Sequence, residues 1–163
     1  MNEPGLQRLT IAELFLPPCI LLKMGATERD EALRELVSHI PALRNNETGQ
    51  QTLLHALRER EQLHSTGIGD GIALPHARNA LVGLVDHPVI VFGRSASGIP
   101  FGAIDGEPAK LLFLLVAPNV TAHLQMLARL SRILRDRRTR RVLLEADRPE
   151  KVITAIRAAE TAL

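Results

Sequence analysis

The chain has one cysteine, no tryptophan, no tyrosine and only four phenylalanines among its 163 residues. The single thiol, Cys19, excludes an intramolecular disulfide framework and a thiolate metal cluster, and it points to a reducing compartment. The scarcity of aromatic side chains argues against a stacking platform for single-stranded nucleic acid. We therefore expect no nucleic-acid ligand.

Long hydrophobic runs are also missing. The longest apolar run, "LLFLLVAP" at 111–118, falls far short of the roughly 20 residues that cross a bilayer as a helix. The first fifteen residues, "MNEPGLQRLTIAELF", lack the basic start and apolar stretch of a signal peptide. We therefore expect no membrane insertion and a cytoplasmic location. The length indicates one domain over 1–163, large enough to bury a substantial core.

Charge is nearly balanced overall but unevenly placed. The chain carries 20 lysines and arginines against 18 acidic residues, for a net charge of +2. The segment "RLSRILRDRRTRR" at 129–141 alone holds seven arginines and one acid, Asp136. Two interpretations stay open for this segment: a solvated helix face, which is the common case, or a docking patch for an acidic partner.

Periodicity and capping signals predict helices at both ends of the chain, with strands between them. The helices are expected at 27–40, 47–63, 121–134, near 136–146 and at 147–160. Short apolar runs bounded by glycine, proline or charge predict strands at 19–24, 71–77, 87–94 and 109–118. The run 111–116 is apolar at every position, which indicates a central strand covered on both faces. The sequence therefore predicts an α/β sandwich with functional loops at strand ends.

Capping residues predict where three of these helices begin. Thr27 is a candidate N-cap for the first helix. Either Asn119 or Thr121 is the candidate N-cap for the helix at 121–134. Asp147 is a candidate N-cap for the last helix, with Glu150 at the capping-box spacing.

The segment "HSTGIGDGIALPHAR" at 64–78 is rich in glycine and carries two histidines. It does not fit a nucleotide-binding loop, because no lysine and hydroxyl pair follows the glycines and a strand-like run comes next. A metal site is not indicated, because the six histidines of the chain show no close ligand spacing. A serine nucleophile is weakly supported, because Ser65 and Thr66 adjoin His64 but the Gly-x-Ser-x-Gly motif is absent. We expect no metal and no cofactor.

His76 is the remaining candidate for chemistry in this segment. Pro75 fixes φ and removes an amide donor, so the strand is an edge strand or ends there, which would leave the imidazole pinned but accessible. A neutral imidazole nitrogen is a competent phosphoryl acceptor near neutral pH. Arg60 and Arg78 lie on either side of the glycine-rich loop and could offset the charge of a phosphoryl group. On these residues alone, a strand-end histidine satisfied by hydrogen bonds is an equally good interpretation.

The stretch "REREQLHSTGIGDGIALPHAR" at 58–78 resembles the active-site motif of a known family. From Arg60 to His76 it fits, nearly position for position, the enzyme IIA proteins of the phosphoenolpyruvate-dependent phosphotransferase system. The resemblance is to the fructose/mannitol superfamily, and most of all to its nitrogen-regulatory branch. The segments 104–118 and 123–134 resemble the family's central strand and the helix that opens with its second histidine. Nearly the whole chain is covered.

The resemblance implies a fold and a set of site residues. The fold would be a small mixed β-sheet flanked by helices on both sides, of the phosphotransferase/anion-transporter-like type. His76 would be the phosphoryl acceptor, His123 would hydrogen-bond the phosphoryl group, and Arg60 would offset its charge. Residues expected to support the phosphate or its loop are Ser65, Thr66, Gly67, Gly69 and Arg78.

The resemblance also implies partners, and two functions stay open. The phosphoryl donor would be HPr or its nitrogen-branch paralogue, and the chain would be a phosphotransferase-system component. One function is a regulator whose phosphorylation state decides which protein target it binds. The other is a sugar-transport component that passes phosphate to the cysteine of a IIB domain. Because we find no IIB or IIC segment and the likeness is closest to the nitrogen branch, we expect the regulator.

Two features depart from the family pattern. His64 stands where relatives usually carry glycine or another residue, and it is either a surface change or an alteration of local charge. The arginine segment 129–141 is more highly charged than the family leads us to expect. Because it would repel a basic carrier, we expect it to lie away from the carrier-binding face or to serve another partner.

Overall fold

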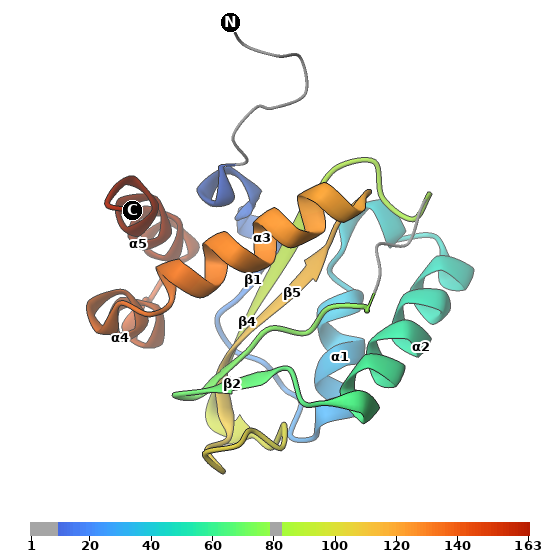
Figure 1. Ribbon diagram of the computed structural model, residues 1–163, viewed down its shortest axis with the longest axis horizontal. Helices are drawn as coiled ribbons and strands as arrows, with labels where there is room; N and C mark the ends of the chain where they lie inside the picture. Colours follow the sequence, from blue (N-terminus) through green and yellow to red (C-terminus); the bar gives the residue numbers. More distant parts are fainter. Residues whose placement is uncertain (1–9, 79–82) are drawn as a thin grey trace, which may run out of the picture.

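A single mixed sheet forms the centre of the computed structural model, which describes residues 10–78 and 83–163 (Figure 1). The strands of the described residues are β1 Ile20–Leu21, β2 Gly67–Gly69, β3 Ile72–Ala73, β4 Val89–Ile99 and β5 Ala109–Val116. Their order in the sheet is β1-β4-β5-β3-β2. β1 pairs with β4 and β3 with β5 in parallel, whereas β4 with β5 and β2 with β3 are antiparallel.

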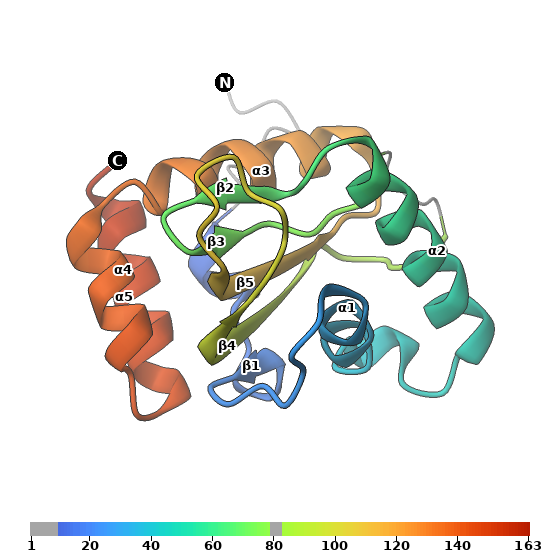
Figure 2. The same ribbon diagram turned by 90° about the horizontal axis from the view of Figure 1, so that it is seen from below.

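Helices cover both faces of this sheet, as Figures 1 and 2 show. The α-helices are α1 Arg29–Val37, α2 Glu47–Leu63, α3 Val120–Ile133, α4 Arg137–Glu145 and α5 Pro149–Thr161. Short 3₁₀ turns lie at Ile11–Leu14, Pro17–Cys19 and Pro41–Leu43. α1 and α2 pack on one face, and α3 with α5 and the first 3₁₀ turn pack on the other. The predicted α/β class, with a mixed sheet between two helical layers, is confirmed.

β5 separates two hydrophobic clusters, because successive side chains of a strand point to opposite faces. Leu112, Leu114 and Val116 join the cluster under α1 and α2. Leu111 and Phe113 join the cluster under α3 and α5. Only Lys110 of this strand is exposed, and the prediction of a central strand covered on both faces is confirmed.

The helix starts follow the predicted caps only in part. Asn119 caps α3, and its side-chain oxygen accepts a hydrogen bond from the amide of Ala122 at 2.9 Å. The prediction of Thr27 as a cap is wrong, because α1 begins at Arg29 and Glu28 occupies the cap position. The prediction of Asp147 as the cap of α5 is also wrong, because Arg148 occupies the cap position.

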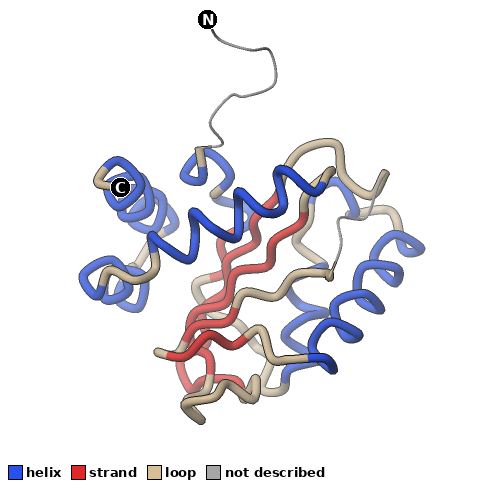
Figure 3. Tube along the Cα trace, viewed as in Figure 1, coloured by secondary structure: helices blue, strands red, loops and turns tan. Residues whose placement is uncertain are grey.

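The strand boundaries depart from the predictions where glycines cluster. The expected strand 71–77 is paired as a strand only at Ile72–Ala73, and the glycine run before it contains β2. β4 continues to Ile99, beyond the expected end at 94. Figure 3 shows the long strands of the sheet crossing the molecule between the helices. Among the described residues, no helix is long and apolar enough to cross a membrane.

Candidate functional site

His76 lies three residues beyond the end of the short strand β3, next to the central strand β5. β3 ends at Ala73, and the chain continues beside β5, where the amide of Leu115 donates to the carbonyl of Pro75 at 3.0 Å. His76 itself forms an isolated parallel bridge with Leu115. The expectation that the strand ends near Pro75 is therefore confirmed. The central strand of the sheet fixes the backbone that carries this imidazole.

A second histidine lies against the first. The cap at Asn119 starts α3 so that His123 falls in its first turn, facing the sheet and only 7% exposed. The ring centroids of His76 and His123 are 5.5 Å apart, and the ring planes meet at 56°. Two segments that are 47 positions apart in the sequence thus bring together the two histidines singled out by the family motif.

The hydrogen bonds of His76 determine which ring nitrogen is available. Its Nδ1 lies 2.6 Å from the carbonyl oxygen of Leu74. A carbonyl oxygen can only accept, so Nδ1 must carry the hydrogen of the neutral ring. The lone pair of the neutral imidazole is then on Nε2. The half-buried ring therefore presents Nε2 as its nucleophilic atom.

The surroundings favour the neutral form of both histidines. Burial lowers the pKa of His76 below its ordinary value of 6.5, and the charges of Arg60 and His123 lower it further. The hydrogen bond to Leu74 acts in the opposite direction but does not outweigh burial. Burial also lowers the pKa of His123. Because an imidazolium has no lone pair to donate, these shifts preserve a nucleophile at and somewhat below neutral pH.

Arg60 lies in the last turn of α2, beside the site. Its Nη1 donates to the carbonyl oxygen of His64 at 2.6 Å, a favourable position for a cation at a helix C-terminus. Arg60 and Arg78 both line a cleft of about 680 Å³ between α2 and the segment that follows His76. The structure therefore brings both predicted arginines to one cleft, at the edge of the histidine pair.

The two predicted hydroxyl residues tie the loop to neighbouring segments. Ser65 donates to the carbonyl of Phe101 and accepts from the amide of Gly67 at 2.9 Å. Thr66 is 3% exposed, and its hydroxyl donates to the carboxylate of Glu61. The same carboxylate accepts from the Thr66 amide at 3.1 Å. Both hydroxyl hydrogens are bonded to neighbouring segments of the protein, so these side chains support the position of the loop.

Glu61 is a site residue whose role the sequence reasoning missed. It is 5% exposed, and burial raises its pKa, although its hydrogen bonds to Thr66 and the charges of Arg29 and Arg60 act to lower it. Its two bonds to Thr66 tie the end of α2 to the start of the glycine segment. Its place beside Arg60 in the family motif was the available signal.

The glycines of the segment form a β-hairpin. β2 and β3 pair around Asp70 and Gly71, which have φ values of 56° and 76°. Positive φ at both central residues defines a type I′ turn, for which Asp-Gly is a favoured pair. Gly69 also has a positive φ of 90°, and a Cβ there would lie 3.0 Å from Asp105. Gly69 and Gly71 therefore stand where the backbone has a positive φ, which glycine adopts without strain.

Asp105 anchors the hairpin and was also missed. Its carboxylate accepts from the amides of Asp70 at 2.9 Å and Glu107 at 3.0 Å. These hydrogen bonds lower the pKa of Asp105. Gly67 lies against the same loop, where an added Cβ would stand 3.0 Å from that of Ala103. Because this contact depends on two segments 35 residues apart, no local sequence signal reveals it.

His64 contributes to the site through its backbone. It is the C-cap residue of α2 with an extended conformation, and its carbonyl receives the hydrogen bond from Arg60. Its side chain is exposed. His87 is exposed as well, at the start of the segment before β4. Within the residues that the structure describes, no three His, Cys, Asp or Glu side chains gather closely enough to hold a metal ion.

Known proteins with a similar fold indicate the class of protein to which this chain belongs. The nitrogen regulatory protein IIA-Ntr of Neisseria meningitidis superposes with a TM-score of 0.77 at 29% identity, covering 90% of this chain and 98% of that one. The family described as "Phosphoenolpyruvate-dependent sugar phosphotransferase system, EIIA 2" matches residues 13–159. The chain belongs to this family, and the resemblance drawn from the sequence is confirmed.

The relatives include both sugar-specific and nitrogen-regulatory proteins. The fructose-specific EIIA component of Haloferax volcanii is 46% identical over 101 residues, which are 61% of this chain and 64% of that protein. The fructose-specific EIIABC component of Bacillus subtilis is 36% identical over 91% of this chain, which spans only 23% of that relative. The nitrogen regulatory protein of Bradyrhizobium diazoefficiens is 34% identical over 78% of this chain and 82% of its own length.

Proposed function

We propose that this protein is a phosphohistidine carrier whose acceptor atom is Nε2 of His76. The hydrogen bond from Nδ1 to Leu74 carries the proposal, because it leaves the Nε2 lone pair free in a neutral ring. The donor is the phosphohistidine of an HPr-type carrier protein. The lone pair attacks phosphorus, the donor's P–N bond breaks, and its electron pair returns to the donor imidazole nitrogen. The metaphosphate-like group passes in line between the two nitrogens.

His123 and Arg60 stabilise the transferred group in this proposal. A phosphoryl group brings nearly two negative charges, which need cationic and hydrogen-bonding partners in a half-buried site. His123 adjoins the His76 ring, and the Arg60 charge already acts on the His76 pKa. Arg78, in the cleft shared with Arg60, adds a second guanidinium near the entrance. Charge-assisted hydrogen bonds to phosphate oxygens are among the stronger ones in proteins.

Phosphorylation from phosphoenolpyruvate, enzyme I and HPr tests the acceptor. Wild type should gain an acid-labile, base-stable phosphate, and His76→Ala should gain none. His123→Ala should fold normally and accept phosphate about a hundredfold more slowly, the usual loss when one preorganised donor is removed. His64→Ala is the matched control and should react at the wild-type rate, because His64 acts through its carbonyl. Phosphate on the His76→Ala protein would refute the assignment.

We further propose that the output is regulatory, with the phosphorylation state of His76 selecting a protein target. Support comes from the nitrogen regulatory relatives, which match over most of their own length, and from the similarity to IIA-Ntr. The second candidate is sugar transport, with phosphate passing from His76 to a IIB domain. The higher identity to a fructose-specific EIIA component favours that alternative.

Phosphate transfer onward separates these two outputs. The phosphorylated protein is mixed with purified IIB domains of the fructose and mannitol type, and loss of its phosphate is followed with time. A regulator should keep its phosphate, while unphosphorylated and phosphorylated protein should differ in affinity for a target protein. Rapid transfer to a IIB cysteine would establish the transport alternative instead.

A further inference from the structure

Positive charge is concentrated in one region of the molecule. The thirteen residues 129–141 carry a net charge of +6, in a chain whose total is +2. The remaining 150 residues therefore sum to −4. A segregation of this size creates a local positive potential that attracts anionic partners and speeds their association.

Two of the seven arginines in this segment are used by the fold. Arg129 forms a salt bridge with the buried carboxylate of Glu160 at 3.1 Å. Arg140 donates to the carbonyls of Leu134 and Arg135, at 2.8 and 3.1 Å, where α3 has ended. These contacts explain why arginine stands at 129 and at 140, and they leave the other five unexplained.

The other five arginines are exposed and form no ion pair with any residue of the described ranges. They are Arg132, Arg135, Arg137, Arg138 and Arg141. Three of them, together with Asp136, line a hollow of about 370 Å³ over the first turns of α4. The carboxylate of Asp136 is engaged by the amides of Arg138 and Thr139, which it caps. Several unpaired guanidinium groups therefore share one small surface.

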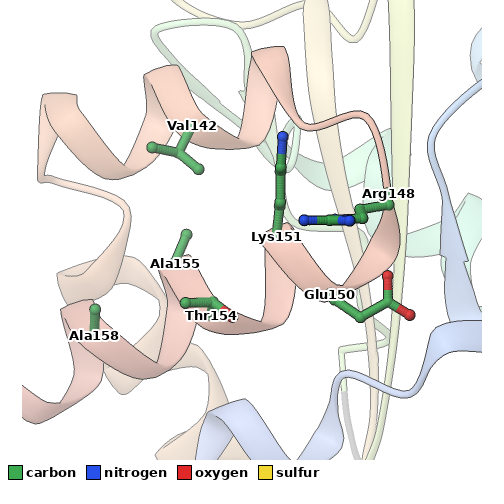
Figure 4. Close-up of a pocket in the computed structure, with 7 residues that line it drawn as sticks. All are labelled: Val142, Arg148, Glu150, Lys151, Thr154, Ala155 and Ala158. Carbon is green, nitrogen blue, oxygen red and sulfur yellow. The ribbon is translucent and has the colours of Figure 1, made fainter.

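An apolar groove runs beside this surface, between α4 and α5. It has a volume of about 880 Å³, and Figure 4 shows Val142 of α4 facing Ala155 and Ala158 of α5 across it. Val142 is 37% exposed. The small alanines allow another backbone to come close. Arg148 and Lys151 lie at the end of the groove nearer the turn between the helices.

Acidic residues at this end of the groove are few, and one of them already forms an ion pair. Asp147 is paired with Lys151 at 2.8 Å, and Glu150 also lines the groove. They balance Lys151 and Arg148 there, so the excess positive charge belongs to the α4 end, at Arg137, Arg138 and Arg141. A ligand for the whole surface needs apolar groups along the groove and negative charges over α4.

This surface lies away from the histidine pair. His123 is in the first turn of α3, whereas Arg132 is nine residues further along the same helix, about 13 Å at 1.5 Å per residue. α4 begins beyond the far end of α3, and Figure 1 shows α4 and α5 at the opposite end of α3 from its N-terminus. A molecule bound over α4 and the α4–α5 groove can therefore sit there without touching His76 or His123.

We propose that the arginine surface and the α4–α5 groove together bind an acidic amphipathic helix of a partner protein. An apolar helix face fits a groove between two helices, and its flanking carboxylates meet the unpaired guanidinium groups. A nucleic acid would leave the apolar groove unused. A membrane surface would need a broader apolar face than Val142 and Leu144, which is 44% exposed, can provide.

The test uses a fluorescent sixteen-residue helical peptide with glutamates on one face and alanine and leucine on the other. Its affinity for the full chain is measured by fluorescence anisotropy at two salt concentrations. Arg138→Gln/Arg141→Gln should weaken binding at least tenfold, and Ala155→Arg should weaken it by blocking the groove. Arg157→Gln is the control, because Arg157 is an exposed arginine of α5 outside both hollows.

Three outcomes would overturn the proposal. The first is a peptide affinity no better than that of a scrambled peptide of the same composition. The second is equal loss in the Arg157→Gln protein, which would indicate attraction by total charge alone. The third is tighter binding of duplex DNA or of phosphatidylserine vesicles than of the peptide. Phosphate acceptance at His76 should be unchanged in all of these variants, which separates this site from the proposed carrier function.

Discussion

At the scale of single residues, the protonation of His76 sets the lower limit of the pH range in which the protein should accept phosphate. Its folded-state pKa is below 6.5, because burial and the neighbouring cations disfavour the imidazolium. We expect the rate of phosphate acceptance to fall to half of its maximum only at a pH below 6.5. The measurement is the initial rate of phosphorylation against pH, beside a proton NMR titration of the His76 ring. A midpoint at or above 6.5 would contradict the proposed burial effect.

The lowered pKa of His76 also makes the free energy of unfolding depend on pH. A histidine whose pKa is lowered by folding binds fewer protons in the folded state than in the unfolded state. Its contribution to the free energy of unfolding is therefore complete above the unfolded value of about 6.5. That contribution is lost as pH falls through the lower, folded-state pKa. Replacing His76 with glutamine should remove this part of the acid sensitivity.

Candidate site residues could be named from the sequence, but their hydrogen-bond partners could not. The resemblance predicted roles for His76, His123 and Arg60, and the structure places the rings of the two histidines in contact. Which nitrogen of His76 is free depends on the direction of the Leu74 carbonyl, which no spacing reveals. Glu61 was visible in the motif, yet its partner Thr66 is five residues away across the end of a helix.

At the scale of elements, the β2–β3 hairpin positions the strand that leads to His76. Gly71 has a φ of 76°, and its carbonyl accepts from the amides of Lys110 and Leu111 at 2.8 and 3.0 Å. A Cβ would meet nothing closer than 3.6 Å, so strain comes from the backbone alone. Gly71→Ala should lower the free energy of unfolding by about 1 kcal/mol and slow phosphate acceptance.

Gly83→Ala is the matched variant for that experiment. Gly83 has a φ of 83° and open space around its Cα, so the alanine meets the same backbone strain. Urea unfolding should therefore show a similar loss of stability, with no change in the phosphorylation rate. If both variants slow phosphorylation equally, the hairpin has no special part in placing His76.

Element prediction was accurate where periodicity was strong and failed where tertiary contacts compete with local signals. The helices and β5 were placed to within a few residues. Asp147 has a good capping side chain, but Lys151 engages it as an ion pair. The Asp70-Gly71 pair forms the turn between β2 and β3, whereas the strand predicted at 71–77 begins inside that turn.

At the scale of the whole molecule, Glu160 joins three distant segments. Its carboxylate accepts from the amides of Ile11 and Ala12 and pairs with Arg129, so it links the first 3₁₀ turn, α3 and α5. Glu160→Ala leaves Arg129 and two buried amides without partners. We expect a loss of about 3 kcal/mol in the free energy of unfolding, measured in urea.

The exposed pair of Lys151 and Asp147 is the control for that loss. Its side chains are 47% and 71% exposed, and water screens their attraction. Lys151→Ala should therefore leave the unfolding midpoint almost unchanged. Similar midpoints for the Glu160→Ala and Lys151→Ala proteins would mean that Glu160 does not hold these segments together.

The arrangement of the whole sheet was beyond local sequence reasoning. The pairing of β1 with β4 joins Ile20 to Phe92, and no pattern within either strand specifies that partner. The mixed sheet was expected only because the family resemblance implied it. Burial on both faces of β5 predicted its central place, but the neighbours on each side required the three-dimensional structure.

A hydrogen bond between β5 and the segment that carries His76 can be followed by hydrogen exchange. The amide of Leu115, a buried residue, is held by the carbonyl of Pro75. Its hydrogen can exchange with deuterium only when that contact opens, either locally or by unfolding of the sheet. The exchange rate of this one amide, compared with its neighbours in β5, therefore reports how often the segment carrying His76 separates from the centre of the molecule.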